Sequence, residues 1–530
     1  MLSNKKSLGQ FFTPLFVAEF MLSLSTKQNH SKVLEPSSGE GVFLVALEKQ
    51  GFRNVLAYEI DSTLNNASTL PITYDSFIDQ NIENIDLVIG NPPYIRWKNI
   101  PQNMKDELNE NTLWKQYFNS LCDYLYIFIL KSIEVLNEDG ELIFITPEYW
   151  MHTTHSISLR NYMLDNGYFE TILHFKETPI FDKVASSIII FKFIKNSKQN
   201  SKQNSKQISY MEYDSRQKLT TELLEKINKG DEIENCTYIK LDQFQHNTKW
   251  LFSNEATLTS IKKYEKLCTI SSGAGLFEED SKIIRLKDIS KIGNGMVSGL
   301  DKAFQLPNDL TLTPLEESKT IRVAKAKHLT QYIVNDTVKY IFITETINEE
   351  NLINNYPNFY QHLYGFIEKL NKRYNYNKNV NYWEWVFLRN YANLFSQNKR
   401  KIFIPCKERI SSKDYVRFAL AKENIFPTQD VTGIYLDDTV QESIYYILAL
   451  LNSKYVFQWL KFNGIIKGNI LEFSNKPTGQ IPIKLIDWQN KIEVSFHNAI
   501  SDLTEQYINS SDKKLLSEIE YQIDNLFNLE

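Results

Sequence analysis

Cysteine is scarce in this 530-residue chain, which has only four, far apart and without a Cys-x-x-Cys pair. That pattern excludes a zinc ribbon and a disulfide framework, and it predicts a reducing compartment. No run of about 18 apolar residues occurs, and the N-terminus lacks the apolar stretch of a signal peptide. We therefore expect a cytoplasmic protein that does not contact a membrane.

Glycine and proline are also few, at 18 and 15 residues, while hydrophobic residues make up 42% and charged residues 23% of the chain. This composition excludes a disordered chain, and the length predicts two or three folded domains. The net charge of −5 argues, at face value, against a nucleic-acid partner.

The first 195 residues alternate β-rich runs with helical stretches. Strands that alternate with helices indicate βαβ units and a parallel sheet covered on both faces, so we expect an α/β domain. The predicted strands lie at 32–36, 54–60, 85–90, 141–146 and 186–194, and the predicted helices at 41–50 and 121–136.

A polar tract at 196–207, in which NSKQ occurs three times, separates two strand-like runs. It predicts an expanded hairpin loop between neighbouring strands. After about residue 240 the alternation stops, and short strands mix with helical pieces up to a helical end from about Trp488. We expect domains at 1–240 and 241–487, followed by a helical segment at 488–530.

A glycine-containing loop follows the first predicted strand. Its sequence, Glu35 to Gly41, reads EPSSGEG, and Glu59 ends the next predicted strand. Glycines at a strand-to-helix turn allow a ligand to approach the backbone, and an acid after the second strand accepts hydrogen bonds from ribose hydroxyls. The loop is acidic and lacks Gly-Lys-Ser/Thr, which excludes a P-loop. S-adenosylmethionine fits, because it is cationic and carries no phosphate.

Asn91, Pro92, Pro93 and Tyr94 come directly after the apolar run 85–90, where open α/β sheets place their active sites. Two prolines stiffen the turn and remove two backbone donors. The Asn91 side-chain oxygen and the Pro92 carbonyl can then accept both hydrogens of a planar NH₂ group, which frees the nitrogen lone pair for attack on a methyl sulfonium. Tyr94 offers a ring face for stacking.

These motifs, in this order, resemble the TaqI-type (gamma class) adenine-N6 DNA methyltransferases. The resemblance implies a Rossmann-like S-adenosylmethionine-dependent sheet followed by a mixed α+β target-recognition domain. Position 76 is Ser where that family has an aromatic, so we take the next residue for the ring over the cofactor adenine. The implied cofactor-binding residues are Phe12, Thr13, Pro14, Glu35, Ser37, Gly39, Glu59, Asp75 and Phe77.

The resemblance also implies base flipping, which the chemistry requires because adenine N6 is paired inside the duplex. Phe181 is implied to stack on the extruded base opposite Tyr94, which completes a predicted catalytic set of Asn91, Pro92, Pro93, Tyr94 and Phe181. Cytosine-C5 chemistry would need a Pro-Cys nucleophile, and Cys406, the one cysteine after a proline, lies far from the predicted sheet.

Basic residues concentrate between Phe366 and Lys422. This stretch contains 13 Lys or Arg but only 4 Asp or Glu, and twelve aromatic residues are interspersed among them. This local +9 leaves −14 for the rest of the chain, so the whole-chain charge averages two opposite regions. Basic side chains neutralise phosphates, and Arg reads guanine edges. The predicted contacts to double-stranded DNA are Lys372, Arg373, Arg389, Lys399, Arg400, Lys401, Arg409 and Arg417.

Alternatives remain open. A protein glutamine or an RNA adenine methyltransferase would use the same amine chemistry, and an inactive DNA-binding relative would keep the same fold. His152 and His155 lack partners at ligand spacing, so no metal is expected. No nuclease motif follows residue 485, so we expect methylation alone, by a monomer, with any restriction endonuclease a separate protein.

Overall fold

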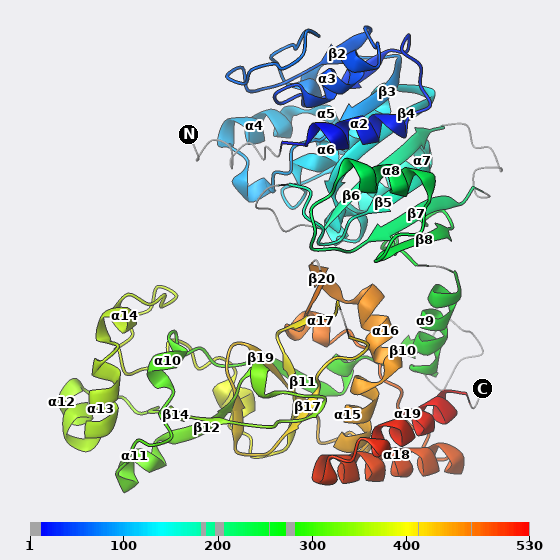
Figure 1. Cartoon of the computed structure of the whole chain (residues 1–530). Helices are drawn as coiled ribbons and strands as arrows, with labels where there is room; N and C mark the ends of the chain where they lie inside the picture. The colour runs from blue at the N-terminus through cyan, green and yellow to red at the C-terminus, as the bar shows by residue number, and fades with distance from the viewer. Residues whose placement is uncertain are drawn as a thin grey trace. The chain divides into compact units, whose positions relative to one another are not determined.

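The computed structural model describes residues 12–181, 187–196, 206–253, 255–271, 281–411, 413–467 and 469–528. It forms two compact units, Met1–Leu258 and Thr259–Glu530 (Figure 1). The first unit ends later than the predicted boundary at 240, because Trp250 is buried in the core of its sheet and Phe252 packs against that core.

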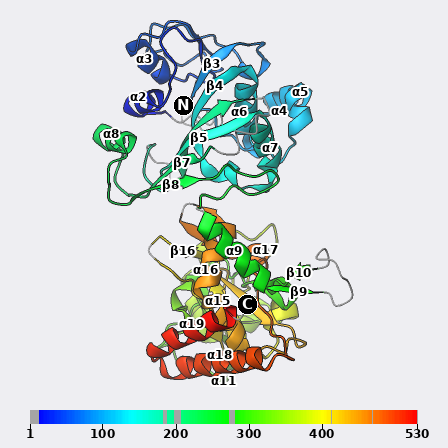
Figure 2. The same ribbon diagram turned by 90° about the vertical axis from the view of Figure 1, so that its right-hand side faces the viewer.

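The first unit is an eight-stranded sheet with helices on both faces (Figure 2). The strand order is β2-β1-β3-β4-β6-β5-β7-β8. The strands are β1 (Val33–Glu35), β2 (Val55–Ala57), β3 (Ile85–Gly90), β4 (Leu136–Pro147), β5 (Gly167–His174), β6 (Ile188–Lys195), β7 (Ile208–Tyr213) and β8 (Cys236–Leu241). The helices are α2 (Leu15–Ser23), α3 (Val42–Lys49), α4 (Gln102–Glu110), α5 (Thr112–Tyr117), α6 (Tyr124–Val135), α7 (Ile157–Asn166) and α8 (Thr221–Lys229).

Each face of the sheet has its own apolar core. On one face α2, α3 and α8 pack on the strands, and on the other face α4 to α7 do (Figure 2). Helix α6 is apolar nearly all round and is buried along its length. Strand β3 is buried on both faces, as expected of a central parallel strand. The predicted α/β class is therefore confirmed.

Two predictions about this sheet are wrong in detail. The sheet is mixed rather than parallel, because β6 and β8 run antiparallel to their neighbours. The strands on either side of the NSKQ tract, β6 and β7, form no hairpin, because β5 lies between them and pairs with both. The tract itself lies mostly outside the described residues.

The second unit contains several small sheets. The largest has the order β11-β19-β15-β17-β13, and two others have the orders β14-β12-β18 and β16-β21-β20. The strands are β9 (Thr269–Ser271), β10 (Ser281–Ile283), β11 (Ser290–Asn294), β12 (Thr320–Ala324), β13 (Tyr332–Ile333), β14 (Val338–Ile341), β15 (Lys401–Pro405), β16 (Lys407–Arg409), β17 (Ala419–Ala421), β18 (Ile425–Pro427), β19 (Val431–Leu436), β20 (Ile465–Lys467) and β21 (Ile470–Glu472).

Helices cover these sheets, and two of them form the helical end of the chain. The predicted separate segment 488–530 belongs to the second unit, because its helices α18 and α19 share one apolar core with α15 and β19. The helices are α9 (Glu255–Leu267), α10 (Asp301–Phe304), α11 (Pro314–Ser318), α12 (Glu349–Asn355), α13 (Pro357–Tyr364), α14 (Ile367–Asn371), α15 (Ile444–Asn452), α16 (Lys454–Asn463), α17 (Asn475–Thr478), α18 (Lys491–Ser510) and α19 (Lys514–Phe527).

Candidate active site

The glycine loop connects the end of β1 to the start of α3. Gly39 has φ +56°, a conformation that favours glycine, and no atom lies within 4 Å of where its Cβ would be. This side of the backbone is therefore open to a ligand. Gly41 also has a positive φ, and a Cβ there would lie 2.5 Å from Oδ1 of Asn66.

Glu35, at the end of β1, is fully buried beneath this loop. Its Oε1 accepts a hydrogen bond from the Ser37 N–H at 3.4 Å, and its Oε2 has no partner in the described part of the chain. A Cβ at Gly90 would lie 2.4 Å from Oε1 of Glu35, so a larger residue at the end of β3 would push this carboxylate from its place. Burial raises the pKa of Glu35 well above its ordinary value, and nearby Glu59 raises it further.

Glu59 follows β2 and closes the other side of the loop. Its Oε2 accepts from the Gly39 N–H at 2.8 Å, and its Oε1 accepts from the Asp61 N–H at 2.9 Å. These two bonds fix the carboxylate at the surface of a cavity, where each oxygen keeps a lone pair for a further donor.

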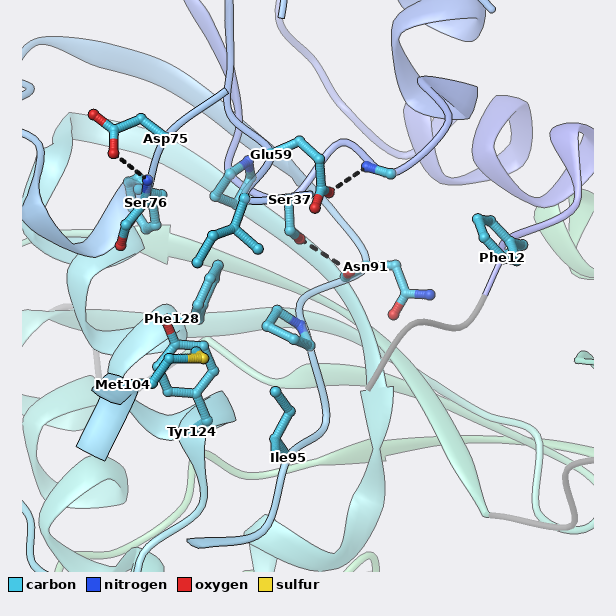
Figure 3. A pocket seen from close by; sticks show the side chains of 15 residues that line it. Phe12, Ser37, Glu59, Asp75, Ser76, Asn91, Ile95, Met104, Tyr124 and Phe128 are labelled. Atoms are coloured by element: carbon cyan, nitrogen blue, oxygen red, sulfur yellow. Dashed lines mark hydrogen bonds between the residues drawn. The ribbon is translucent and has the colours of Figure 1, made fainter. Parts of the chain in front are cut away.

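The cavity lies at the carboxyl ends of β1, β2 and β3 and encloses about 700 Å³, its open mouth included (Figure 3). Eight predicted residues line it: Phe12, Ser37, Gly39, Glu59, Asp75, Phe77, Asn91 and Pro93. Asp75 lies at its rim, where its oxygens accept from the Ser76 N–H at 2.8 Å and from Gln80 at 3.0 Å. The ring of Phe77 lies beneath, 5.6 Å from the ring of Phe128.

The sequence did not predict a role in the site for the remaining lining residues. Met104 comes from α4, and Tyr124 and Phe128 from α6, which reach the cavity from the side opposite Glu59 (Figure 3). Met104 and Leu108 are four residues apart, and this helical spacing predicts a buried face of α4. The spacing does not predict which part of the domain that face packs against. The others in this group are Pro36, Ile60, Ser76 and Ile95.

Asn91 lies at the inner wall, immediately after β3. Its Nδ2 donates to Thr13 Oγ1 at 3.0 Å, its Oδ1 accepts from the Tyr94 hydroxyl, and its carbonyl accepts from Ser37 Oγ at 3.1 Å. The Tyr94 hydroxyl also contacts the carbonyl of Ile145 at 2.6 Å, and burial raises the pKa of Tyr94. Thr13 therefore fixes which way the carboxamide faces, and Tyr94 occupies its acceptor oxygen.

Several predicted residues do not line the cavity. Thr13 and Tyr94 form hydrogen bonds with the Asn91 side chain, and Glu35 is buried beneath the glycine loop. Pro14 precedes the first turn of α2. Phe181 is 5% exposed and is buried with core side chains of the sheet, next to the undescribed residues 182–186. Its stacking on a target base stays a prediction.

A second buried polar cluster lies at the ends of β4 and β5. The Nε2 of His174 lies 2.5 Å from Oε2 of Glu148 and 2.7 Å from Ser187 Oγ, and its Nδ1 lies 2.9 Å from the Tyr210 hydroxyl. That hydroxyl donates to Glu212 at 2.8 Å. Burial alone would raise the pKa of Glu148, but His174, Lys176 and His152 together outweigh it and lower this pKa to about 2.

We expect Glu148→Gln to lower the free energy of unfolding by about 2 kcal/mol at neutral pH, because it removes a charge-assisted hydrogen bond. Since the pKa of Glu148 is depressed on folding, this stabilisation is complete above about pH 4.5 and is lost as the pH falls towards about 2. Urea unfolding over that range measures it. Glu222→Gln on α8, in an exposed pair, should change little. Parallel pH profiles for Glu148→Gln and the parent would contradict this role.

Three of the eight predicted DNA contacts make bonds within the second unit. Lys401 is fully buried, and its Nζ donates to the Glu423 carbonyl at 2.6 Å. Arg417 pairs with buried Glu408 at 2.5 Å. The Arg373 guanidinium donates to three backbone carbonyls, and its burial lowers its pKa to about 10. These cations stabilise the fold of the second unit.

The other five predicted contacts lie at or near the surface. Lys399 contacts Asp438 and Arg400 contacts Glu423, whereas Lys372 and Arg409 are exposed and Arg389 is half-buried. Within the residues that the structure describes, no His, Cys, Asp and Glu cluster could hold a metal ion. None of the described helices is both long and apolar enough to span a membrane.

Comparison with known proteins places the chain in a family. Residues 19–181 match the family model of the Eco57I restriction-modification methylase. Over 528 residues the chain is 44% identical to the Type II methyltransferase M.HindII of Haemophilus influenzae, covering 99% of this chain and 98% of that protein. The chain belongs to the Type II restriction-modification methyltransferases. A second member, M.HincII of Haemophilus influenzae, is 42% identical over 525 residues.

Among solved structures, the Type IIL restriction-modification enzyme MmeI, determined in complex with DNA, superposes with a TM-score of 0.59. The match covers 97% of this chain and 72% of that enzyme at 11% identity, so it supports a shared fold over both units. Our sequence-based assignment to the methyltransferases is thus confirmed at the level of the Type II family.

Proposed function

We propose that this Type II methyltransferase transfers a methyl group from S-adenosylmethionine to N6 of adenine in duplex DNA, after the base has been flipped out of the helix. The arrangement that carries the proposal is Asn91 in the wall of the same cavity that Gly39 and Glu59 line, with its carbonyl bonded to Ser37 of the glycine loop. Methyl donor and acceptor can thus meet at the end of β3.

The residues present fit the donor. The unpartnered Oε2 of Glu35 is a buried acceptor suited to a cation, and Glu59 has lone pairs for two neighbouring hydroxyls. Phe77 and Asp75 together suit an adenine ring and its amino group. When bound, S-adenosylmethionine supplies an electrophilic methyl group on a sulfonium.

The chain's own contribution to the reaction is to position the amine. Oδ1 of Asn91 accepts one N6 hydrogen, which displaces the Tyr94 hydroxyl, while Thr13 keeps the carboxamide oriented. Pro92 has no N–H that could compete, and we expect its carbonyl to accept the second hydrogen. With its lone pair held in this way, N6 would accept the donor's methyl group, the sulfonium would leave as a neutral thioether, and the proton released by N6 would pass to water. No covalent enzyme intermediate is needed.

The substrate class is tested by incubating the chain with S-[methyl-³H]adenosylmethionine and, in parallel, plasmid DNA, total RNA and a soluble protein extract. We expect label in DNA alone. Label confined to RNA or protein would favour the other amine acceptors.

We also expect the chain to be a monomer and any restriction endonuclease to be a separate protein. Sedimentation of the purified chain as a monomer, and its failure to cleave plasmid, would support these two expectations.

A further inference from the structure

The segment of the second unit that follows α14 (Figure 1) carries exposed aromatic rings with cations beside them. We call it the Tyr374 surface: Tyr374, Tyr376, Lys378, Phe387 and Arg389. The three rings are 71%, 40% and 37% exposed. The centroids of Tyr374 and Tyr376 lie 4.7 Å apart, and those of Tyr376 and Phe387 lie 6.2 Å apart. A protein that left these rings in water for no purpose would be unusual.

Cations flank the rings. The Nζ of Lys378 lies 4.3 Å and the guanidinium of Arg389 lies 5.4 Å from the centroid of Phe387. Residues 371–390 contain four Lys or Arg against a single acid, Glu384, and six asparagines. Rings, cations and carboxamides together match the sugars, phosphates and base edges of a nucleic acid.

The surface is also held rigidly. Tyr376 and Asn377 both have positive φ, at +56° and +60°, in a turn closed by the Lys378 N–H to the Asn375 carbonyl at 3.1 Å. The Arg373 guanidinium ties the segment to the carbonyls of Asn381 and Glu384, both at 2.8 Å.

Phe387 is fixed as well, because its backbone exchanges hydrogen bonds with Val297 at 2.9 and 3.0 Å. A partner that binds here therefore has little backbone to order, which lowers the cost of association.

We propose that the Tyr374 surface contacts duplex DNA, with Lys378 and Arg389 against phosphates and the ring of Tyr374 against the sugars and base edges of a groove. This rests on the proposed DNA substrate and adds an apolar element to a contact that charge alone had suggested. In place of Arg373, Lys401 and Arg417, which bond within the second unit, it assigns the contact to other side chains of this unit that reach the surface.

The test is fluorescence anisotropy of the full chain with labelled random-sequence duplex over a series of salt concentrations. Tyr374→Ala should weaken binding about tenfold and leave the salt dependence unchanged, since a ring contact releases no counterions. Tyr374→Phe should bind like the parent. Lys378→Gln should reduce the slope of log K against log salt by about one. Tyr521→Ala, which removes a tyrosine 63% exposed on α19, is the matched control and should change nothing.

The outcomes separate this inference from the proposed function. If the parent chain neither binds duplex nor labels DNA, the proposed function fails. If the parent binds and labels DNA but Tyr374→Ala and Lys378→Gln match it in affinity and salt slope, the inference alone is overturned. A loss confined to single-stranded oligonucleotide would also overturn it. Photocrosslinks from a 5-iodouracil duplex should map to Tyr374, Tyr376 or Phe387, and crosslinks only elsewhere would contradict it.

Discussion

Asn91→Ala will reduce methyl transfer by at least about 100-fold while the chain still binds S-adenosylmethionine and DNA, because the lost carboxamide oxygen acts on the amine as it reacts. Binding is expected to persist because the proposed donor site uses Glu59 and the glycine loop, and the proposed DNA contact uses the Tyr374 surface. Single-turnover methylation, measured beside separate titrations of donor and duplex, gives the two effects independently.

The control for this variant has to account for lost hydrogen bonds, since removal of the Asn91 carboxamide breaks its bonds to Thr13 and to Tyr94. Asn161→Ala removes a half-buried carboxamide that bonds Asn247 at 2.8 Å and does not line the cavity, and this variant should methylate normally. A near-normal rate for Asn91→Ala would contradict the proposed amine chemistry.

Glu35→Gln will weaken S-adenosylmethionine binding about 100-fold and at the same time stabilise the cofactor-free protein. The affinity falls because a buried carboxylate no longer pairs with the cationic donor. The stability rises at pH values above the raised pKa of Glu35, because a buried, incompletely paired charge is removed there at nearly constant shape. Equilibrium dialysis and thermal unfolding without cofactor measure the two opposite changes.

The pH dependence gives this prediction a sign. The pKa of Glu35 is raised on folding, so the folded state favours the protonated acid. The parent without cofactor should therefore lose stability as the pH rises from about 4.5 through the raised pKa, and Glu35→Gln should lack this loss. Affinity for the donor should increase over the same rise.

Glu141→Gln is the matched control for Glu35→Gln, because Glu141 is a second buried acid of the same sheet. It bonds Ser25 and Thr26 and pairs with Lys192 at 3.1 Å, so its replacement should destabilise the fold without changing donor affinity. If Glu35→Gln behaved in the same way, Glu35 would be a structural residue only.

Much of the candidate site could be predicted because its signals are local. The loop Glu35 to Gly41, the acid Glu59 and the turn after β3 are each defined by neighbours within a few residues, and parallel strands bring their ends to one edge. Met104, Tyr124 and Phe128 could not be predicted, since which helix covers the cavity depends on packing between distant segments.

The same distinction explains the errors. In the sheet, β5 lies between β6 and β7. The polar tract that connects β6 to β7 in the sequence does not indicate this strand order. A count of basic residues between Phe366 and Lys422 measures charge but does not show which side chains reach the surface. It therefore included Lys401, whose burial lowers its pKa to about 8. Exposure, which only the folded chain defines, separates cations that hold the fold from those that can face DNA.

The most direct test of the account is the identity of the modified nucleoside. Duplex DNA methylated by the purified chain is digested to nucleosides and analysed by mass spectrometry beside DNA treated with Asn91→Ala. The account predicts N6-methyldeoxyadenosine as the product of the parent chain and its loss in the variant. N4-methyldeoxycytidine, 5-methyldeoxycytidine or unmodified DNA from the parent would contradict it.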